Sequence, residues 1–274
     1  MFLFVVGFAL IYWPRLDSFS FANAIGEVGF ITALYFSGNV STVLGFGDIT
    51  PRDPVLQATV VTQAALGFGV VTAGITYLLK VILSTQDRNI LARRLWIESG
   101  RTSDGLQALL MQLETEDISD VHARFLSLTQ SLYHLEEQLR RLPVIDLLYR
   151  SGPPEHSTER MLQTGAGLAM SARIAARGPE ARRLGAVADQ MSDMITLIMR
   201  NAIVEWFGSE TVARFDRADE EPRDHERVGE MTEILASRLP HLGIPPALGP
   251  LEDIRRLESR TRIFLAETRG GSSR

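Results

Sequence analysis

The sequence predicts an all-α protein with two parts, an apolar membrane part followed by a charged helical part, and three observations support this class. First, the 26 residues from 54 to 79 carry no charged side chain. As a helix they would be about 39 Å long, which is enough to cross a bilayer. Second, apolar residues beyond position 117 recur at steps of three and four, the period of a helix. Third, that later part contains no strand-like alternation of useful length.

Charged side chains are concentrated in the later part of the chain. Only three of the 28 basic side chains and only four of the 33 acidic side chains lie in the first 83 residues. Both signs are mixed along the rest, as on a solvated helical surface, and there is no basic patch for nucleic acid. The chain has no cysteine, which excludes disulfides and thiolate metal sites.

The first apolar segment, residues 1–13, is short for a membrane-spanning helix, which needs about 20 residues. Either the true first helix begins before Met1, or the chain after Pro14 completes it. A basic leader and a clear small-residue cleavage site are both missing, which argues against a signal peptide. Residues 15–28 contain three charged side chains, and we expect them to form a surface link.

Residues 29–42 are apolar but too short to cross a membrane together with the stretch that follows. They fit a re-entrant half-helix, whose C-terminal end would direct its dipole towards cations. Non-helical chain beyond such a helix is tolerated at membrane depth only where it lines water. Residues 50–54 then predict a turn, and Pro54 is a favourable first residue for the next helix.

The uncharged run from 54 to 79 predicts the inner membrane helix. Lys80 follows it directly, and Arg88, Arg93 and Arg94 come soon after. The positive-inside rule assigns this end of the helix to the cytoplasm. We therefore expect a multi-pass protein of the plasma membrane with a cytoplasmic C-terminal domain.

The stretch between the half-helix and the inner helix, residues 40–48, reads Val-Ser-Thr-Val-Leu-Gly-Phe-Gly-Asp. Two glycines separated by one residue are often an ordinary turn, but the two flanking segments favour a pore loop. Rings of backbone carbonyls can replace the water shell of a dehydrated cation, and alternate glycines permit the backbone angles that this requires. The aromatic residue can brace the loop, and the carboxylate can attract cations to the mouth.

This stretch resembles the selectivity filter of potassium channels, Thr-Val-Gly-Tyr-Gly-Asp. Anchoring on the glycines assigns the five filter positions to Val43, Leu44, Gly45, Phe46 and Gly47. Asp48 then falls on the family's aspartate, and the resemblance implies that K⁺ is bound at residues 43–46. A competing register treats Leu44 as an insertion and keeps Thr42 as the innermost ligand, with a hydroxyl that Val43 lacks.

The resemblance is to prokaryotic potassium channels with two membrane helices and one pore loop per subunit, and it covers residues 1–85. One pore loop cannot surround an ion, so the resemblance implies a homotetramer in membrane lipid. It also implies K⁺ as the permeant ion and no bound cofactor.

Gly67 lies 20 residues after Gly47, where inner helices of this family bend to open. The resemblance makes Gly67 a candidate gating hinge, and close packing of small residues between membrane helices is the alternative. Six polar side chains of this helix could contact pore water or be satisfied by packing: Gln57, Thr59, Thr62, Gln63, Thr72 and Thr76.

A separate helical domain is expected at residues 86–274, after a membrane domain at residues 1–85. Residues 86–99 continue the inner helix, and residues 118–142 form an amphipathic helix that Pro143 ends. After it come a short segment at 144–149, a break at 151–154, and helices at about 156–177, 179–207, 222–239 and 250–268.

Two other classes of domain are excluded for residues 86–274. Many related channels carry a cytoplasmic Rossmann domain, which needs strands and a GxGxxG turn that this sequence lacks. The glycines at 165 and 167 lie in a helical pattern and are interpreted as packing residues. The five histidines are scattered and form no catalytic or metal motif, so no enzymatic activity is expected.

The sequence thus predicts a subunit of a potassium-selective channel, with a helical domain that assembles or gates it and could bind an unknown cytoplasmic ligand or partner. Two alternatives stay open. Val43 and Leu44 depart from the filter pattern, which favours a weakly selective cation channel. A membrane-anchored helical sensor without conduction is the alternative from another class.

Overall fold

The computed structural model of the protein describes residues 1–22, 28–141, 153–218, 226–245 and 251–270. The chain divides into two compact units, Met1–Ile82 and Leu83–Arg274. Helix α3, Pro54–Glu98, begins in the first unit and ends in the second. Nearly all of the regular structure is helical, which confirms the predicted all-α class.

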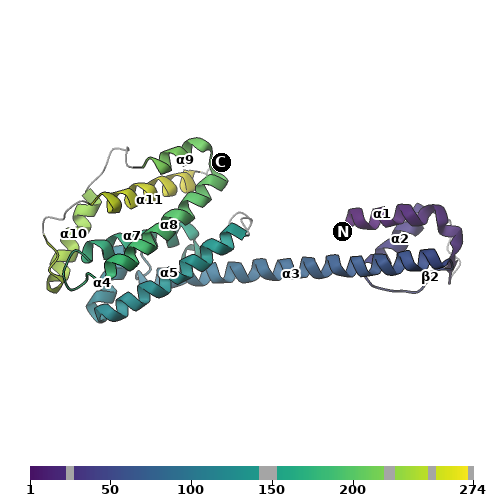
Figure 1. The fold of residues 1–274 in the computed structure, drawn as a ribbon, viewed down its shortest axis with the longest axis horizontal. Coiled ribbons are helices and arrows are strands. Elements are labelled where there is room, and N and C mark those ends of the chain that lie inside the picture. Colours follow the sequence, from purple (N-terminus) through teal and green to yellow (C-terminus); the bar gives the residue numbers. More distant parts are fainter. Residues whose placement is uncertain (23–27, 142–152, 219–225, 246–250, 271–274) are drawn as a thin grey trace. The chain divides into compact units, whose positions relative to one another are not determined.

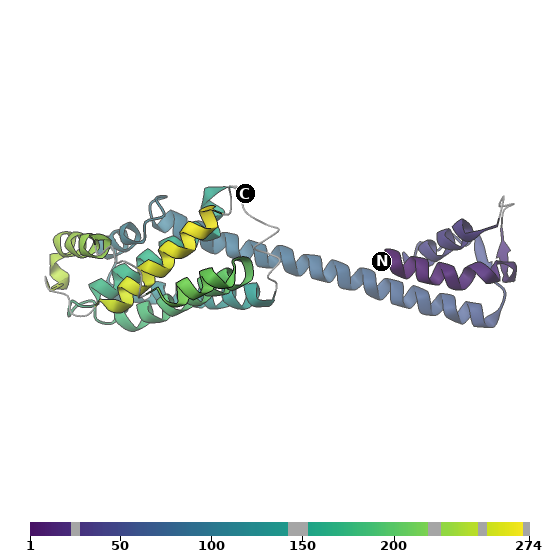
Figure 2. The ribbon, with the colours of Figure 1, turned by 90° about the horizontal axis from the view of Figure 1, so that it is seen from above.

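The first unit consists of helices with one pair of short strands among its described residues. Helices α1 and α2 and the first part of α3 lie side by side (Figures 1 and 2). The elements are α1 (Phe2–Tyr12), the 3₁₀ helix η1 (Trp13–Ser18), β1 (Phe19–Phe21), α2 (Phe30–Ser41), β2 (Ile49–Pro51) and the start of α3.

Helix α2 occupies the segment in which the half-helix was predicted, which confirms a short helix there. Its re-entrant position in a membrane stays a prediction. Its twelve residues extend about 18 Å, well short of a hydrocarbon core of about 30 Å. Helix α1 has eleven residues and passes into η1 at Trp13, where Pro14 removes a backbone donor. The chain after Pro14 thus continues as a 3₁₀ turn rather than as the completion of an α-helix.

The strands β1 and β2 are not predicted by the sequence, which indicated a surface link and a turn at these positions. They pair antiparallel, with Phe19 opposite Pro51 and Phe21 opposite Ile49. Three residues are too few for an alternating pattern to appear in the sequence. The pairing is set by contacts between segments about 30 residues apart, and it connects the end of η1 to the chain before α3.

An aromatic cluster forms the core of the first unit. The rings of Tyr12, Phe19 and Phe36 meet edge to face, with centroids 5.0 to 5.8 Å apart. All three residues are buried, and such ring pairs stabilise a core beyond the area that they bury. The cluster thereby fixes α1, β1 and α2 against one another.

Helix α3 is the one helix of the described residues that is long and apolar enough to cross a membrane. It has 45 residues and includes the uncharged run that was predicted to span. The helix continues through Lys80 and ends at Glu98, so the predicted extension over residues 86–99 is confirmed to within one residue. Gly100, Arg101 and Ser103 follow with positive φ angles, and they turn the chain sharply.

The second unit is a bundle in which α7 and α8 lie in the middle, with α11 on one side and α5 on another (Figure 1). From Met161 to Ala175, every residue of α7 except Gln163 and Arg173 is buried. The described helices of this unit, besides the end of α3, are α4 (Gly105–Thr115), α5 (Ile118–Arg141), α7 (Thr158–Ala175), α8 (Leu184–Trp206), α9 (Ser209–Asp216), α10 (Glu226–Arg238) and α11 (Glu252–Gly270), with 3₁₀ turns η2 (Pro154–His156) and η3 (Pro240–Leu242).

Small residues on α7 allow another helix to approach its backbone. A Cβ atom at Gly105, the first residue of α4, would lie 2.0 Å from the backbone nitrogen of Leu168. A Cβ atom at Gly167 would lie 3.1 Å from the nitrogen of Gly105. Only glycine fits such a contact without displacement of a helix, so the packing interpretation of Gly167 is confirmed.

The helix boundaries of the second unit differ from the prediction in three places. Helices α4 and α9 are not predicted, and α8 begins at Leu184, because a turn occupies residues 179–183. The predicted helix starts at 222 and 250 and the short segment at 144–149 lie outside the described residues, as do Leu142 and Pro143. The assignment of a membrane domain and a cytoplasmic domain stays a prediction.

Candidate functional site

The predicted filter residues form an irregular loop between α2 and β2. At its inner end the loop is tied to α2, because the backbone nitrogen of Val43 donates to the carbonyl of Val40 at 3.1 Å. The nitrogen of Leu44 likewise donates to the carbonyl of Asn39 at 3.2 Å. At its outer end the carbonyl of Asp48 accepts a hydrogen bond from the nitrogen of Ala22, beside the strand pair. Both ends are therefore fixed by backbone contacts.

The sign of φ alternates along this loop. The φ angle is 59° at Val43, 64° at Gly45 and 74° at Gly47, while the residues between them do not have positive φ. In a strand successive carbonyls point in opposite directions, whereas alternation between right- and left-handed conformations lets successive peptide groups point the same way. The two glycines adopt positive φ at little cost, but Val43 is β-branched and is strained there.

Two side chains of α2 support the loop from one side. The Tyr35 hydroxyl donates to Asp48 Oδ2 at 2.8 Å. Asn39 is buried, and its Oδ1 accepts the backbone nitrogen of Phe46 at 3.5 Å. These two supporting residues are not identified by the sequence. The signal that could have found them is their spacing of four residues, which puts both on one face of the half-helix.

The side chains of the filter residues are exposed in the single chain. Val43, Leu44 and Phe46 are 56%, 61% and 64% exposed. The expected bracing by Phe46 is therefore not made within this chain. The Thr42 hydroxyl donates to the carbonyl of Gly38 at 2.8 Å, so its proton is used within α2 while its lone pairs remain.

Gly67 of α3 lies directly against the end of α2. A Cβ atom at this position would be 2.4 Å from the Ser41 carbonyl oxygen and 2.9 Å from the Ser41 Cα atom. Close packing, one of the two interpretations of this glycine, is therefore present in the structure. The hydroxyls of Thr59, Thr62 and Thr76 donate to carbonyls one turn earlier in α3.

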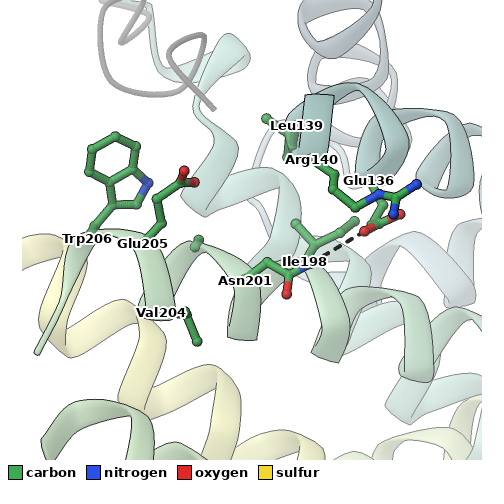
Figure 3. A pocket seen from close by; sticks show the side chains of 9 residues that line it. Glu136, Leu139, Arg140, Ile198, Asn201, Val204, Glu205 and Trp206 are labelled. Atoms are coloured by element: carbon green, nitrogen blue, oxygen red, sulfur yellow. Dashed lines mark hydrogen bonds between the residues drawn. The ribbon is translucent and has the colours of Figure 1, made fainter. Parts of the chain in front are cut away.

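A cavity in the second unit is a separate candidate site (Figure 3). It has a volume of about 330 Å³ and lies between the last turns of α5 and α8. Glu136 and Asn201 point towards one another in it, with Asn201 Nδ2 3.4 Å from Glu136 Oε1. Its lining combines apolar, acidic and aromatic side chains: Glu136, Leu139, Ile198, Asn201, Glu205 and Trp206.

Comparison with known proteins gives three findings. Residues 1–84 match a family model described as "Ion channel". A curated relative, "Uncharacterized membrane protein YdjJ" of Bacillus subtilis (strain 168), is 23% identical over 155 residues, which are 57% of this chain and 45% of the relative. The chain thus spans less than half the length of this relative. No solved structure matches the chain. Residues 1–84 are therefore similar to an ion channel, and the chain is similar to a membrane protein.

Proposed function

We propose that this protein is the subunit of a potassium-selective ion channel and that four copies form one pore. The similarity of residues 1–84 to ion channels supports conduction. The loop from Thr42 to Asp48 would supply one quarter of the filter, because one loop cannot enclose an ion. K⁺ would bind at the backbone carbonyls of residues 43–46.

The alternating sign of φ along the loop is the observation on which the proposal mainly rests. Positive φ at Val43, Gly45 and Gly47 favours carbonyl groups that share one direction. A dehydrated K⁺ ion needs several carbonyl rings stacked along its path. An ordinary glycine turn would need only one or two such angles and would not require a strained valine.

The surroundings of the loop agree with this proposal. The C-terminal end of α2, at Ser41, lies directly before the loop, and the partial negative charge of a helix C-terminus favours a nearby cation. Asp48 lies at the opposite end and can attract cations to the mouth. The exposed side chains of Leu44 and Phe46 would pack against neighbouring subunits in the tetramer.

A weakly selective cation channel is the second candidate, and Val43 favours it. The family's filter has threonine at this position, and its hydroxyl adds one ring of ligands to the innermost site. Valine has nearly the same shape but offers no side-chain oxygen. Four such losses in a tetramer would remove a complete ring of ligands, which would weaken the inner site.

A flux assay on purified, reconstituted protein tests the proposal. Liposomes that contain the protein should release K⁺ faster than liposomes without it. When the liposomes are loaded with Na⁺ in place of K⁺, ion release should be slower. Comparable K⁺ and Na⁺ flux would favour the weakly selective channel. No flux of either ion, from protein shown to be folded and inserted, would refute conduction and favour the membrane-anchored sensor.

The number of subunits needs its own measurement. Native mass spectrometry in mild detergent should give a species of four chains and none larger. A monomer or a dimer as the largest stable species would contradict the pore, because two loops cannot surround a K⁺ ion with rings of carbonyls.

The helical domain would lie in the cytoplasm, because Lys80, Arg88, Arg93 and Arg94 follow the uncharged run of α3. We propose that it regulates the pore and that a small cytoplasmic ligand binds in the cavity between α5 and α8. The volume of about 330 Å³ lies within the range of small-molecule sites. Its lining of apolar side chains with a few polar and charged ones is typical of such sites. Ala202 lies at the cavity, and Ala202→Trp should fill it and abolish a ligand-dependent change in flux.

A further inference from the structure

Gln63 of α3 is a buried polar residue in the membrane unit, and it makes contact with two other helices. Its side chain is completely buried. The Tyr12 hydroxyl of α1 donates to Gln63 Oε1 at 2.7 Å. On the other side, Gln63 Nε2 lies 2.8 Å from Ser37 Oγ and 2.7 Å from Ser41 Oγ of α2. Polar groups at membrane depth are costly to bury, so such a residue points to a function.

The orientation of the Gln63 amide is fixed by its partners. Nε2 also lies 3.0 Å from the carbonyl oxygen of Ser37, which can only accept a hydrogen bond. The nitrogen must therefore face α2, and the oxygen must face the Tyr12 hydroxyl. The hydroxyl of Ser37 is itself tied to α1, because it donates to the carbonyl of Val5 at 2.7 Å.

The contact between α3 and α2 is formed by two matched pairs of residues. Gln63 and Gly67 are four residues apart on α3, and Ser37 and Ser41 are four residues apart on α2. Residues at this spacing lie on one face of a helix. Gln63 holds both serines by hydrogen bonds, while Gly67 allows the backbone of Ser41 to approach so closely that a Cβ atom would be 2.4 Å from its carbonyl oxygen.

Ser41 is the last residue of α2, and Thr42 and Val43 follow it directly. A displacement of the last turn of α2 would therefore move the start of the filter loop. The strained φ of Val43, 59°, can persist only if the residues before it are held firmly. The groups that hold Ser41 in place are the amide of Gln63 and the close approach at Gly67.

We propose that Gln63 and Gly67 are positioning residues through which α3 sets the geometry of the filter, and that Gly67 acts as a contact point rather than as a hinge. This inference rests on the proposed function of residues 42–48. Because α3 is one uninterrupted helix up to Glu98, a rotation of α3 about its axis would pull directly on Ser41. Ion selectivity would then respond to the state of α3.

The test uses variants of the full-length chain in two groups. The first group disturbs the contact with the filter end of α2: Ser41→Ala, Gln63→Met and Gly67→Ala. The second group consists of matched controls. Tyr77→Phe deletes one hydroxyl of α3 at an exposed position outside this contact, and Gly69→Ala makes the same substitution on the same helix at a site where no atom lies within 4 Å of an added Cβ.

Two quantities are measured in each variant. The first is the ratio of K⁺ to Na⁺ flux in liposomes. In the first group this flux ratio should fall roughly fivefold or more, because one net hydrogen bond contributes about 1 kcal/mol, which corresponds to a factor of about five. It should change less than about twofold in the controls, which corresponds to less than about 0.4 kcal/mol. The second is hydrogen exchange of the loop 42–48, which should be faster in the first group only.

The outcomes separate this inference from the proposed function. Equal flux ratios and equal loop exchange in both groups would overturn the inference, even if the wild-type chain conducts K⁺ selectively. Faster exchange in the first group, with no flux in the wild type, would support the positioning role and refute the channel. If Gly67→Ala does not fold, Ser41→Ala against Tyr77→Phe gives the same decision, because each deletes a single hydroxyl. If Gly67 were a hinge, Gly67→Ala would slow opening without a change in selectivity, which would contradict its role as a contact.

Discussion

The hydroxyl of Tyr35 donates to the carboxylate of Asp48 at 2.8 Å, and this bond connects the first half of α2 to the C-terminal end of the proposed filter loop. Asp48 is only partly exposed, and its carbonyl also accepts the nitrogen of Ala22. Asp48 is thus held by two separate segments, through the side chain of Tyr35 and through the backbone of Ala22. We expect this double attachment to keep the loop open to ions.

The first prediction concerns the Tyr35 hydroxyl. Tyr35→Phe removes one hydrogen bond to a carboxylate and should lower the K⁺ to Na⁺ flux ratio roughly threefold to tenfold, because such bonds are worth about 1 kcal/mol or more. Tyr77→Phe is the matched control, since Tyr77 is an exposed tyrosine of α3 that lies outside the loop. Identical flux ratios in the two variants would show that the Tyr35 bond does not hold the mouth.

The second prediction concerns the register of the filter. If Gly45 anchors it, Val43→Thr adds a hydroxyl ring at the innermost site and should strengthen block by barium. The strain at Val43 should remain, because threonine is also β-branched. If Leu44 is an insertion, Thr42→Val should be the damaging change. Barium block measured in both variants decides between the registers, and an unaltered Val43→Thr beside a weakened Thr42→Val would refute the first one.

The third prediction is that the second unit folds alone. Its helices bury one continuous apolar core, including Phe125, Leu168, Ile195 and Leu235, within residues 83–274. Such a core is of the kind that an independently folding domain contains. Residues 83–274 expressed alone should be soluble and strongly helical by circular dichroism. A dominant β signal or complete aggregation would contradict this prediction.

The fourth prediction concerns Glu98, the last residue of α3. Its Oε1 accepts Arg94 Nε at 2.9 Å and an Arg124 guanidinium nitrogen at 3.2 Å. Burial lowers the pKa of Arg124, but its neighbours Glu98 and Glu116 raise it more, so the net shift is upward. Glu98→Gln keeps the shape but removes the charge between two arginines. We expect it to lower the free energy of unfolding by about 1–2 kcal/mol.

The control for Glu98 is Glu137→Gln on α5. Glu137 also pairs with two arginines, Arg140 and Arg141, but those partners are highly exposed. Exposed pairs of this kind contribute little, because water screens them and the side chains lose freedom. Urea unfolding of the isolated second unit should therefore separate Glu98→Gln from the wild type and leave Glu137→Gln unchanged. Equal midpoints for all three proteins would contradict the role given to Glu98.

The fifth prediction concerns acid stability. Arg200 of α8 donates to both carboxylate oxygens of Asp216 in α9, at 2.8 and 2.9 Å. This pairing lowers the pKa of Asp216, while partial burial opposes the shift. A lowered pKa in the folded state contributes stability above the unfolded pKa of about 4, and the contribution is lost as the pH falls through the lowered value.

Arg200→Gln removes the cause of that shift. The variant should be less stable than the wild type at pH 6, and the difference should shrink as the pH falls below about 4, where Asp216 becomes protonated in both proteins. The effect should be small, because both side chains are more than a third exposed. A difference that grows on acidification would have the wrong sign and would rule out this account.

The long elements of the first unit could be predicted from the sequence because their signals are local. The uncharged run of α3 and the apolar stretch of α2 are each contained within one segment. The strand pair could not be predicted, since Phe19 and Pro51 are far apart in sequence and each strand has three residues. In the second unit α4 and α9 are short, and tertiary contacts such as Gly105 against Leu168 determine where they lie.

The same distinction holds for the candidate site. The glycines and Asp48 could be identified from composition and order. Their supports could not, because Tyr35, Asn39 and Gln63 act through contacts that appear only when α2 and α3 are packed. Gln63 was equally consistent with contact to pore water, and its full burial is a property of the folded unit.

The hydrogen bond from Ala22 to Asp48 has a consequence for the order of events during synthesis. The two residues close a loop of the chain that includes the whole of α2, and the strand that completes the closure, β2, comes after the filter. A nascent chain that has emerged only as far as Gly47 therefore lacks the partner for β1. The segment at Phe19–Phe21 must wait, unpaired, until Ile49–Pro51 has left the ribosome, and the C-terminal end of the proposed filter loop is fixed only then.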